Sequence, residues 1–276
     1  MALQITSLNS GSNGNCYYVA NDSEAILIDT GISCKETEKR MALLGLSMKM
    51  VKAIFISHEH TDHIKGLPVI AAKYNLPVFI SKGTYRNSGL SIYAGAVNWL
   101  NAGDAVYIGE LCITSFLKQH DAEDPHSFVV THNGINVGVF TDLGVCCDQL
   151  VSHFKTCHAA FLEANYDETM LENGRYPWFL KNRIRGGKGH LSNTQALEIF
   201  TKHRPPNLSH LLLAHLSKDN NDPQLVQRLF ESQAQQTKII VASRYAATGI
   251  YTITNDLHPK LVQTVSPKPV QMQLFY

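Results

Sequence analysis

The hydrophobic pattern of the chain begins with three short apolar runs in close succession, at residues 3–7, 16–20 and 25–29. Turn-forming residues separate these runs, so they predict a meander of β-strands. After the meander, apolar runs alternate with segments of helical pattern along most of the remaining sequence. A purely β start followed by alternating β and α elements predicts an α/β (α+β) fold in which helices cover the outer face of a sheet.

The later elements are bounded by apolar runs and by residues that start or end helices. A capping box of Ser33 with Glu36 predicts one helix start, and a second box begins at Ser192. The predicted helices cover residues 33–45, 66–74, 146–157, 177–186 and 192–201, and another begins at Asp222. The predicted strands cover residues 51–56, 76–80, 105–117 as two strands, 127–131, 135–140, 209–214 and 238–242, with 159–167 as a strand and a polar loop. Residues 249–253 are expected to pair with the strand at 238–242.

Residues 57–63, Ser-His-Glu-His-Thr-Asp-His, directly follow the apolar run at 51–56 and contain three imidazoles. Nitrogen and oxygen donors of this kind are the ligands that Zn²⁺, Mn²⁺ and Fe²⁺ accept. Positions two apart on a helix point to different faces, so the spacing favours an extended strand end from which His58, His60 and Asp62 point the same way. The sequence therefore predicts a metal site at the carboxyl edge of a sheet.

Other predicted strands also end in histidines or carboxylates that can complete this site. A first cation with three nitrogen ligands needs one more histidine, and His120 and His126 both follow the strand region at 105–117. The two oxygens of Asp142 can bridge two cations, although a helix N-cap is the alternative role. His215 ends a further strand. Because all of these positions fall at strand ends on one edge, we expect the side chains to converge.

The string His-x-His-x-Asp-His after an apolar strand resembles the second motif of the metallo-β-lactamase superfamily. The resemblance implies a four-layer αββα sandwich that holds two metals at one end. It also implies that Asp29, in the first motif, supports the histidine loop through hydrogen bonds, and it favours His120 over His126. The ligands assigned to the two cations are His58, His60, Asp62, His63, His120, Asp142 and His215.

Two other strings resemble the WalJ-like (YycJ) branch of this superfamily, whose members are regarded as DNA-directed exonucleases. The first is Gly-His-Leu-Ser-Asn at 189–193, which implies that His190 binds the scissile phosphate or protonates the leaving group; a buried structural histidine is the alternative. The second is Glu-x-Asn at 163–165, after which Tyr166 stands where the branch has histidine, so the role of this position is open. We assign catalytic roles to Asp62 and His190.

The composition narrows the function classes further. A chain of 276 residues with 44% hydrophobic content can bury the core of one large domain, to which residues 255–276 would add an edge strand or a tail. The net charge of +1 excludes a global field that draws the protein to nucleic acid or membrane. Six cysteines without a Cys-x-x-Cys pair, together with no signal or membrane-spanning pattern, predict a cytoplasmic protein with reduced thiols.

Positive charge is concentrated in one place, the eight residues from Lys181 to Lys188. A basic run of this kind can follow a nucleic-acid backbone, and a solvated helix face is the alternative. The side chains assigned to substrate binding are Asn165, Lys181, Arg183, Arg185, Lys188 and Ser217.

These observations predict a metal-dependent hydrolase of phosphodiesters, and the resemblance to the branch refines it to a nuclease or exonuclease acting on DNA. Two divalent cations, Zn²⁺ or Mn²⁺ with Fe²⁺ as a further candidate, would activate a hydroxide for attack on phosphorus. A thioesterase or lactonase of the glyoxalase type is the first alternative, and a non-catalytic, metal-stabilised scaffold is the second. The predicted partner is nucleic acid or another phosphodiester, with no membrane and an open oligomeric state.

Overall fold

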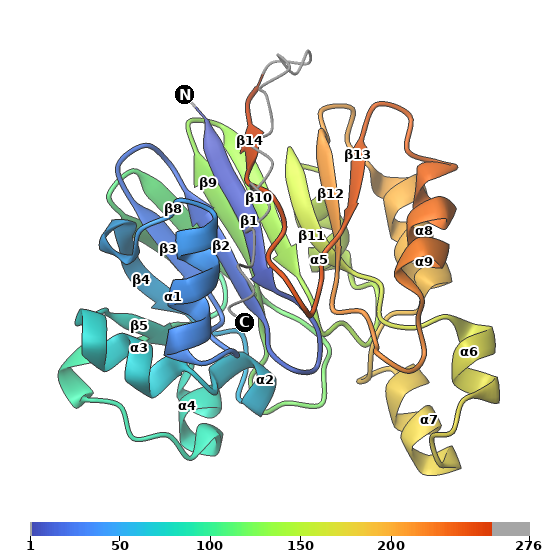
Figure 1. The fold of residues 1–276 in the computed structure, drawn as a ribbon, viewed down its shortest axis with the longest axis horizontal. Coiled ribbons are helices and arrows are strands. Elements are labelled where there is room, and N and C mark those ends of the chain that lie inside the picture. The colour runs from blue at the N-terminus through green and yellow to red at the C-terminus, as the bar shows by residue number, and fades with distance from the viewer. Residues whose placement is uncertain (1, 256–276) are drawn as a thin grey trace, which may run out of the picture.

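The computed structural model describes residues 2–255, which form two β-sheets packed face to face between two layers of helices (Figure 1). The first sheet has the strand order β14 (Tyr251–Ile253), β1 (Leu3–Asn9), β2 (Cys16–Ala20), β3 (Ala25–Ile28), β4 (Val51–Phe55), β5 (Val78–Ile80) and β6 (Val97–Trp99). The second has the order β13 (Lys238–Val241), β12 (His210–Ala214), β11 (Ala159–Glu163), β10 (Ile135–Phe140), β9 (His126–His132), β8 (Leu111–Leu117) and β7 (Ala105–Ile108).

Both sheets follow the same plan. In the first, strands β14, β1, β2 and β3 pair antiparallel, and β3 to β6 pair parallel. In the second, β7 to β10 pair antiparallel, and β10 to β13 pair parallel. The parallel strands of each sheet therefore end at one edge, which is where open α/β folds place their functional sites.

Helices cover the outer face of each sheet. Along the chain they are α1 (Cys34–Leu43), α2 (Thr61–Ile64), α3 (Leu67–Tyr74), α4 (Lys82–Ser88), α5 (Asp148–Phe154), α6 (Glu168–Asn173), α7 (Trp178–Arg185), α8 (Asn193–His203) and α9 (Pro223–Glu231). Apolar side chains of α1 and α3 pack on the first sheet, and those of α5, α8 and α9 pack on the second. Helix α8 extends over 11 residues, about 16 Å, and none of the helices in the described part of the chain is long and apolar enough to span a membrane.

A third apolar layer joins the inner faces of the two sheets. Phe55 of β4 lies edge-on to Phe128 of β9 with ring centroids 5.9 Å apart, and Tyr17 of β2 meets Phe161 of β11 at 4.9 Å. Strands β3 and β11 are buried along their whole length. Because strands that are covered on both faces leave little room for polar groups, the chemistry of the protein is restricted to the strand ends.

The αββα sandwich confirms the predicted fold, and most predicted elements are present within a few residues of their expected ends. The capping box at Ser192 forms as predicted and starts α8. The box at Ser33 forms only in part, because Glu36 accepts a hydrogen bond from Arg40 Nε at 2.7 Å. The expected edge strand or tail at 255–276 falls almost entirely outside the described residues.

Two local predictions were wrong. Residues 249–253 do not pair with β13, because β14 crosses to the other sheet and pairs antiparallel with β1, beginning at Leu3 and Ile253. The histidine loop is not a continuation of a strand, because β4 ends at Phe55 and Thr61–Ile64 form the short helix α2. The helix reverses the chain, and the carbonyl oxygen of Asp62 then accepts a hydrogen bond from the Asn15 N–H at 2.7 Å.

Candidate metal centre

The seven predicted ligands all lie at one edge of the sandwich. His58 and His60 follow β4, Asp62 and His63 lie on α2, His120 follows β8, Asp142 follows β10 and His215 follows β12. They fall into overlapping groups whose donor atoms lie within 4.8 Å of one another. Four separate stretches of sequence thus meet at a single cluster, as the positions at strand ends predicted.

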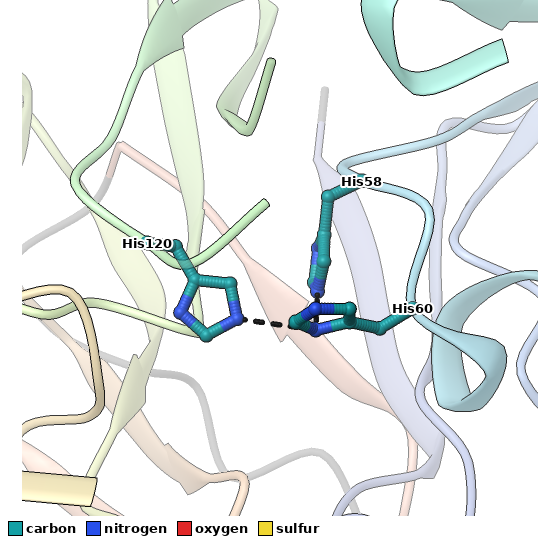
Figure 2. Close-up of side chains that lie close together, drawn as sticks. All are labelled: His58, His60 and His120. Carbon is teal, nitrogen blue, oxygen red and sulfur yellow. Dashed lines mark hydrogen bonds between the residues drawn. The ribbon is translucent and has the colours of Figure 1, made fainter. Parts of the chain in front are cut away.

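The first group consists of His58, His60 and His120, whose rings converge in Figure 2. Nδ1 of His60 lies 3.0 Å from Nε2 of His58 and 3.3 Å from Nε2 of His120. Zinc–nitrogen bonds of 2.0–2.1 Å at tetrahedral angles place ligand nitrogens roughly 3.3 Å apart. The three nitrogens therefore already have a spacing suited to one cation. His126 lies outside this group, with its Nδ1 hydrogen-bonded to the Asp124 carbonyl at 2.9 Å.

The second group consists of Asp62, His63 and His215, with Asp142 beside it. Oδ2 of Asp62 lies 3.6 Å from Nε2 of His63 and 3.4 Å from Nε2 of His215. Oδ2 of Asp142 lies 3.3 Å from Nε2 of His63, and its Oδ1 lies 3.8 Å from Nε2 of His120. Asp142 therefore contacts histidines of both groups and occupies the position that a bridging carboxylate needs.

Asp29 holds the histidine loop in place. Its carboxylate accepts hydrogen bonds from the N–H and hydroxyl of Ser57, each at 2.8 Å, and from Nδ1 of His63 at 2.7 Å. Because the Ser57 hydroxyl donates to Asp29, it accepts from Nδ1 of His58 at 2.9 Å. Both imidazoles thus bond to the protein through Nδ1 and turn Nε2 toward the cluster, the usual arrangement around ligating histidines. The family resemblance implied hydrogen bonds of this kind for Asp29, and its supporting role at a metal site stays a prediction.

Glu163 plays the equivalent part for the second sheet, a role that the sequence pattern did not predict. Its Oε1 accepts from Nδ1 of His190 at 2.8 Å and of His215 at 3.0 Å. Its Oε2 accepts from the backbone N–H of Leu143 at 2.8 Å and of Leu191 at 3.1 Å. Burial raises the pKa of Glu163, but the neighbouring imidazoles, His190 first, outweigh it and lower the pKa to about 2. The signal that could have revealed this residue is a lone carboxylate at the end of the otherwise apolar run in β11.

Three carboxylate and imidazole residues of the candidate site have a left-handed backbone conformation. Asp29, Asp142 and His215 have φ values of 60°, 56° and 57°, and each directly follows or closely follows the last residue of a strand. A non-glycine residue in this conformation costs roughly 1–3 kcal/mol and is held there only by its surroundings. At each position the turn ends the strand while the side chain remains buried in the cluster, so strain and burial occur together at the candidate site.

The two groups differ in charge. Burial lowers the pKa of His58 far below its usual range and that of His120 to about 4, so both imidazoles are neutral and able to ligate. Burial also acts to lower the pKa of His63, but Asp142, Asp29 and Asp62 outweigh it and raise this pKa to about 10. In the metal-free protein the second group therefore holds protons that a cation has to displace, whereas His58 and His120 hold none.

A buried lysine lies against the cluster and was also missed. The Lys118 side chain donates from Nζ to the Thr141 carbonyl at 2.7 Å and is 5% exposed. Burial lowers its pKa, an effect that the nearby carboxylates, Asp142 first, oppose. Its hydrogen bond fixes the residue that precedes Asp142. A lysine at the end of the β8 strand gave no signal in the sequence, because lysines at such positions are commonly exposed.

Two residues predicted to bind substrate lie beside His215. Asn165 is 6% exposed and donates from Nδ2 to the His215 carbonyl at 2.7 Å, and its own carbonyl accepts from the Ser217 N–H at 2.8 Å. The Ser217 hydroxyl accepts from the Asn220 N–H at 3.3 Å. Tyr166 is also buried and bridges to Ser192 through its backbone. These contacts stabilise the loop that carries His215, and a direct contact with substrate stays a prediction.

The predicted basic run lies on and after α7, next to the first group. Arg183 donates from Nε to Asp121, whose Oδ1 lies 3.3 Å from Nε2 of His120. Arg185 pairs with Glu172 at 2.9 Å, and Lys181 bonds to the carbonyl of the same residue. The fourth basic side chain, Lys188, is exposed. Arg183 therefore reaches the rim of the cluster, whereas Lys181 and Arg185 bond to α6.

Comparison with known proteins gives three results. The family model of the Metallo-beta-lactamase superfamily matches residues 10–89. The chain is 35% identical over 243 residues to the exodeoxyribonuclease YycJ of Bacillus anthracis, covering 86% of this chain and 91% of that protein, and 31% identical to the exodeoxyribonuclease WalJ of Streptococcus pneumoniae, covering 84% and 88%. Among solved structures, the metallo-β-lactamase fold protein YhfI of Bacillus subtilis superposes with a TM-score of 0.69 at 15% identity, covering 91% of this chain and 100% of that one.

Proposed function

The chain belongs to the metallo-β-lactamase superfamily and to its YycJ and WalJ group, and from that premise we propose that it is a metal-dependent exonuclease that cleaves phosphodiester bonds of DNA. The observation that carries the proposal is the convergence of five imidazoles and two carboxylates from four separate stretches of sequence at one sheet edge. The relatives of similar length act on DNA according to their names, which favours DNA over a thioester as the substrate.

We further propose that the cluster holds two divalent cations. His58, His60 and His120 would hold one, Asp62, His63 and His215 the other, and Asp142 would contact both. Oδ2 of Asp142 is buried and accepts no hydrogen bond from the described residues, so it has a free lone pair where a shared cation would lie. The donors are nitrogen and oxygen only, which suits Zn²⁺, Mn²⁺ or Fe²⁺. Such cations supply two effects when bound: they lower the pKa of a coordinated water and polarise a phosphoryl oxygen.

The exposed rim of the cluster indicates where a phosphodiester would approach. The side chains of His60, Asp62 and His190 are 30%, 22% and 21% exposed, whereas those of His58 and His63 are completely or almost completely buried. Substrate would therefore meet the cluster on the side of these three residues.

His190 is the residue of the rim best placed to act on the phosphate. Glu163 accepts from its Nδ1 and so leaves Nε2 free to face the substrate. From that position His190 would donate a hydrogen bond to a phosphate oxygen or a proton to the leaving oxygen. Arg183 lies next to the same rim through Asp121 and would bind an adjacent phosphate.

The proposal is tested by incubating purified protein with Zn²⁺ or Mn²⁺ and bis(p-nitrophenyl) phosphate, a thioester, or end-labelled single- and double-stranded DNA. We expect metal-dependent cleavage of the phosphodiester and stepwise shortening of DNA. His60→Ala should abolish both activities, whereas His203→Ala, which changes a histidine on α8 outside the cluster, should retain them.

The same experiment separates the alternatives. Cleavage of the thioester alone would make the protein a thioesterase. Turnover of none of the substrates, with bound metal present, would favour a scaffold and refute the proposed hydrolase.

A further inference from the structure

The α6–α7 segment, residues 167–186, presents two large aromatic side chains that the other described residues leave uncovered. Trp178 is 74% exposed and Phe179 is 69% exposed, and they are neighbours at the start of α7. Helix α7 has no buried residue, and it lies at the lower right of Figure 1, below the helices that cover the second sheet. Single exposed aromatics are common, but two adjacent ones on a helix without a buried face contribute nothing to the core.

The other end of α7 is fixed to the candidate metal centre. The carbonyl of Ile184 accepts from the His190 N–H at 2.8 Å, and the carbonyl of Gly189 accepts from Nδ1 of His120 at 3.0 Å. Gly144 packs tightly on Gly187. A Cβ atom added to Gly144 would lie 2.2 Å from the carbonyl oxygen of Gly187. The helix therefore has one end held against the site and its aromatic end projecting from it.

Helical geometry connects the aromatics to the basic side chains. Phe179 and Arg183 are four residues apart, so they lie on the same face, about 6 Å apart along the axis. Arg183 in turn bonds to Asp121 at the rim of the first histidine group. Trp178 shares its face with Arg185, seven residues on. Aromatic surface, positive charge and the histidine cluster thus follow one another over a short distance.

We propose that Trp178 and Phe179 stack on the bases of a single DNA strand whose end lies at the histidine cluster. This inference rests on the proposed function. Aromatic side chains combined with positive charge are what proteins use to hold single strands without sequence preference, since every base has a face on which to stack. A protein partner fits less well, because the core of a protein interface is depleted in charged residues and the run from Lys181 to Lys188 carries four of them.

Fluorescence gives the most direct test, because the chain has only two tryptophans. Trp99→Phe on β6 leaves Trp178 as the single tryptophan of the chain. Titration of this variant with an oligo-dT strand in EDTA, which prevents cleavage, should quench its emission in a saturable way. Unchanged emission at concentrations where anisotropy of a labelled strand shows binding would refute stacking by Trp178. Because no turnover is needed, the result is independent of whether the protein hydrolyses DNA.

Kinetics give the second test. Trp178→Ala and Phe179→Ala should each raise KM for single-stranded DNA roughly 5- to 150-fold, the range expected for loss of one stacked base. Hydrolysis of bis(p-nitrophenyl) phosphate should stay within twofold, because that substrate is too small to reach from the cluster to the aromatic end of α7. Tyr107→Ala on β7, another side chain that is 70% exposed, is the matched control and should leave both substrates unaffected.

Three outcomes would overturn the inference: an unchanged KM for DNA, an equal loss on both substrates, or conversion of a dimeric wild type to a monomer by the double variant. The last outcome would mean that the aromatics bind a second copy of the chain. If wild-type protein cleaves neither substrate but Trp178 is quenched by DNA, the proposed hydrolase fails and the binding surface stands.

Discussion

Replacing Glu163 by glutamine should weaken metal binding although Glu163 is not among the proposed ligands. Its four lone-pair positions are already filled, by two imidazole N–H groups on Oε1 and two backbone N–H groups on Oε2. Glu163→Gln keeps the size of the side chain but turns one acceptor oxygen into a donor. Whichever way the amide is oriented, its NH₂ group then faces two buried N–H donors, either the two imidazoles or the two backbone groups.

The two orientations have different consequences. If the amide faces the backbone, two buried N–H groups lose their acceptor, at about 1–3 kcal/mol each, which destabilises the protein by roughly 2–6 kcal/mol. If it faces the imidazoles, His190 and His215 can accept at Nδ1 instead, and the proton moves to Nε2. This second arrangement is less costly, but a protonated Nε2 cannot ligate. We therefore expect metal affinity to fall roughly 10- to 100-fold, as for other residues that orient ligating histidines.

The assay is calorimetric titration of metal-free Glu163→Gln with Zn²⁺, together with urea unfolding of the same protein. Glu198→Gln is the control, because Glu198 lies exposed on α8 and pairs with Lys202 at the surface. Metal affinity within twofold of wild type, combined with a free energy of unfolding within about 0.5 kcal/mol, would show that Glu163 does not orient the cluster.

Further predictions concern the ligands and the turn that supports them. His120→Ala should remove one equivalent of bound metal, measured by elemental analysis, whereas His126→Ala should retain it; the reverse result would exchange their roles. Gly31→Ala should destabilise the protein by about 3 kcal/mol or more in urea unfolding, because its Cβ would lie 1.7 Å from the Asp62 carbonyl oxygen, and a smaller change would mean that the turn can relax. In EDTA, the free energy of unfolding should fall between pH 6.5 and 10 by up to roughly 1.4 kcal/mol per pH unit. The reason is the raised pKa of His63: over this range the folded state still holds a proton that the unfolded state has lost. Equal urea midpoints at pH 7 and pH 9 would contradict this.

The residues that converge at the candidate metal centre could be predicted from the sequence because their signal is local. Each predicted ligand lies close to the end of an apolar run, and an apolar run of that length already indicates a strand whose end lies at the edge of a sheet. The dense spacing of His58, His60 and His63 adds a motif that few other sites produce. The histidine loop was wrongly predicted to be extended, whereas Thr61–Ile64 form a helix. Asp62 was still predicted to lie in the cluster, because a single helical turn brings it to the position that an extended strand would reach.

Contacts between distant segments could not be predicted in this way. The partner of β14 is β1, from the opposite end of the sequence, and the side chains of Thr6 and Thr248, just before β14, are hydrogen-bonded at 3.0 Å. The role of Glu163 depends on donors that lie between 20 and 52 residues away in the chain. The pairing of Arg183 with Asp121 spans 62 residues. No periodicity or short motif carries such information.

The two central strands show why a buried carboxylate at a strand end is not enough to identify a ligand. Asp29 follows β3 and Asp142 lies just beyond β10, the fourth strand in each sheet order, and both have a left-handed backbone and are almost completely buried. Their surroundings differ in the number of donors. Asp29 accepts three hydrogen bonds, two from Ser57 and one from His63, whereas Oδ2 of Asp142 accepts none from the described residues. A buried carboxylate oxygen without a hydrogen bond is stabilised by a neighbouring positive charge, which protonated His63, with its Nε2 3.3 Å away, supplies in the metal-free protein and a bound cation would supply in its place. The same position in the fold therefore supports the loop in one sheet and is available to bind metal in the other.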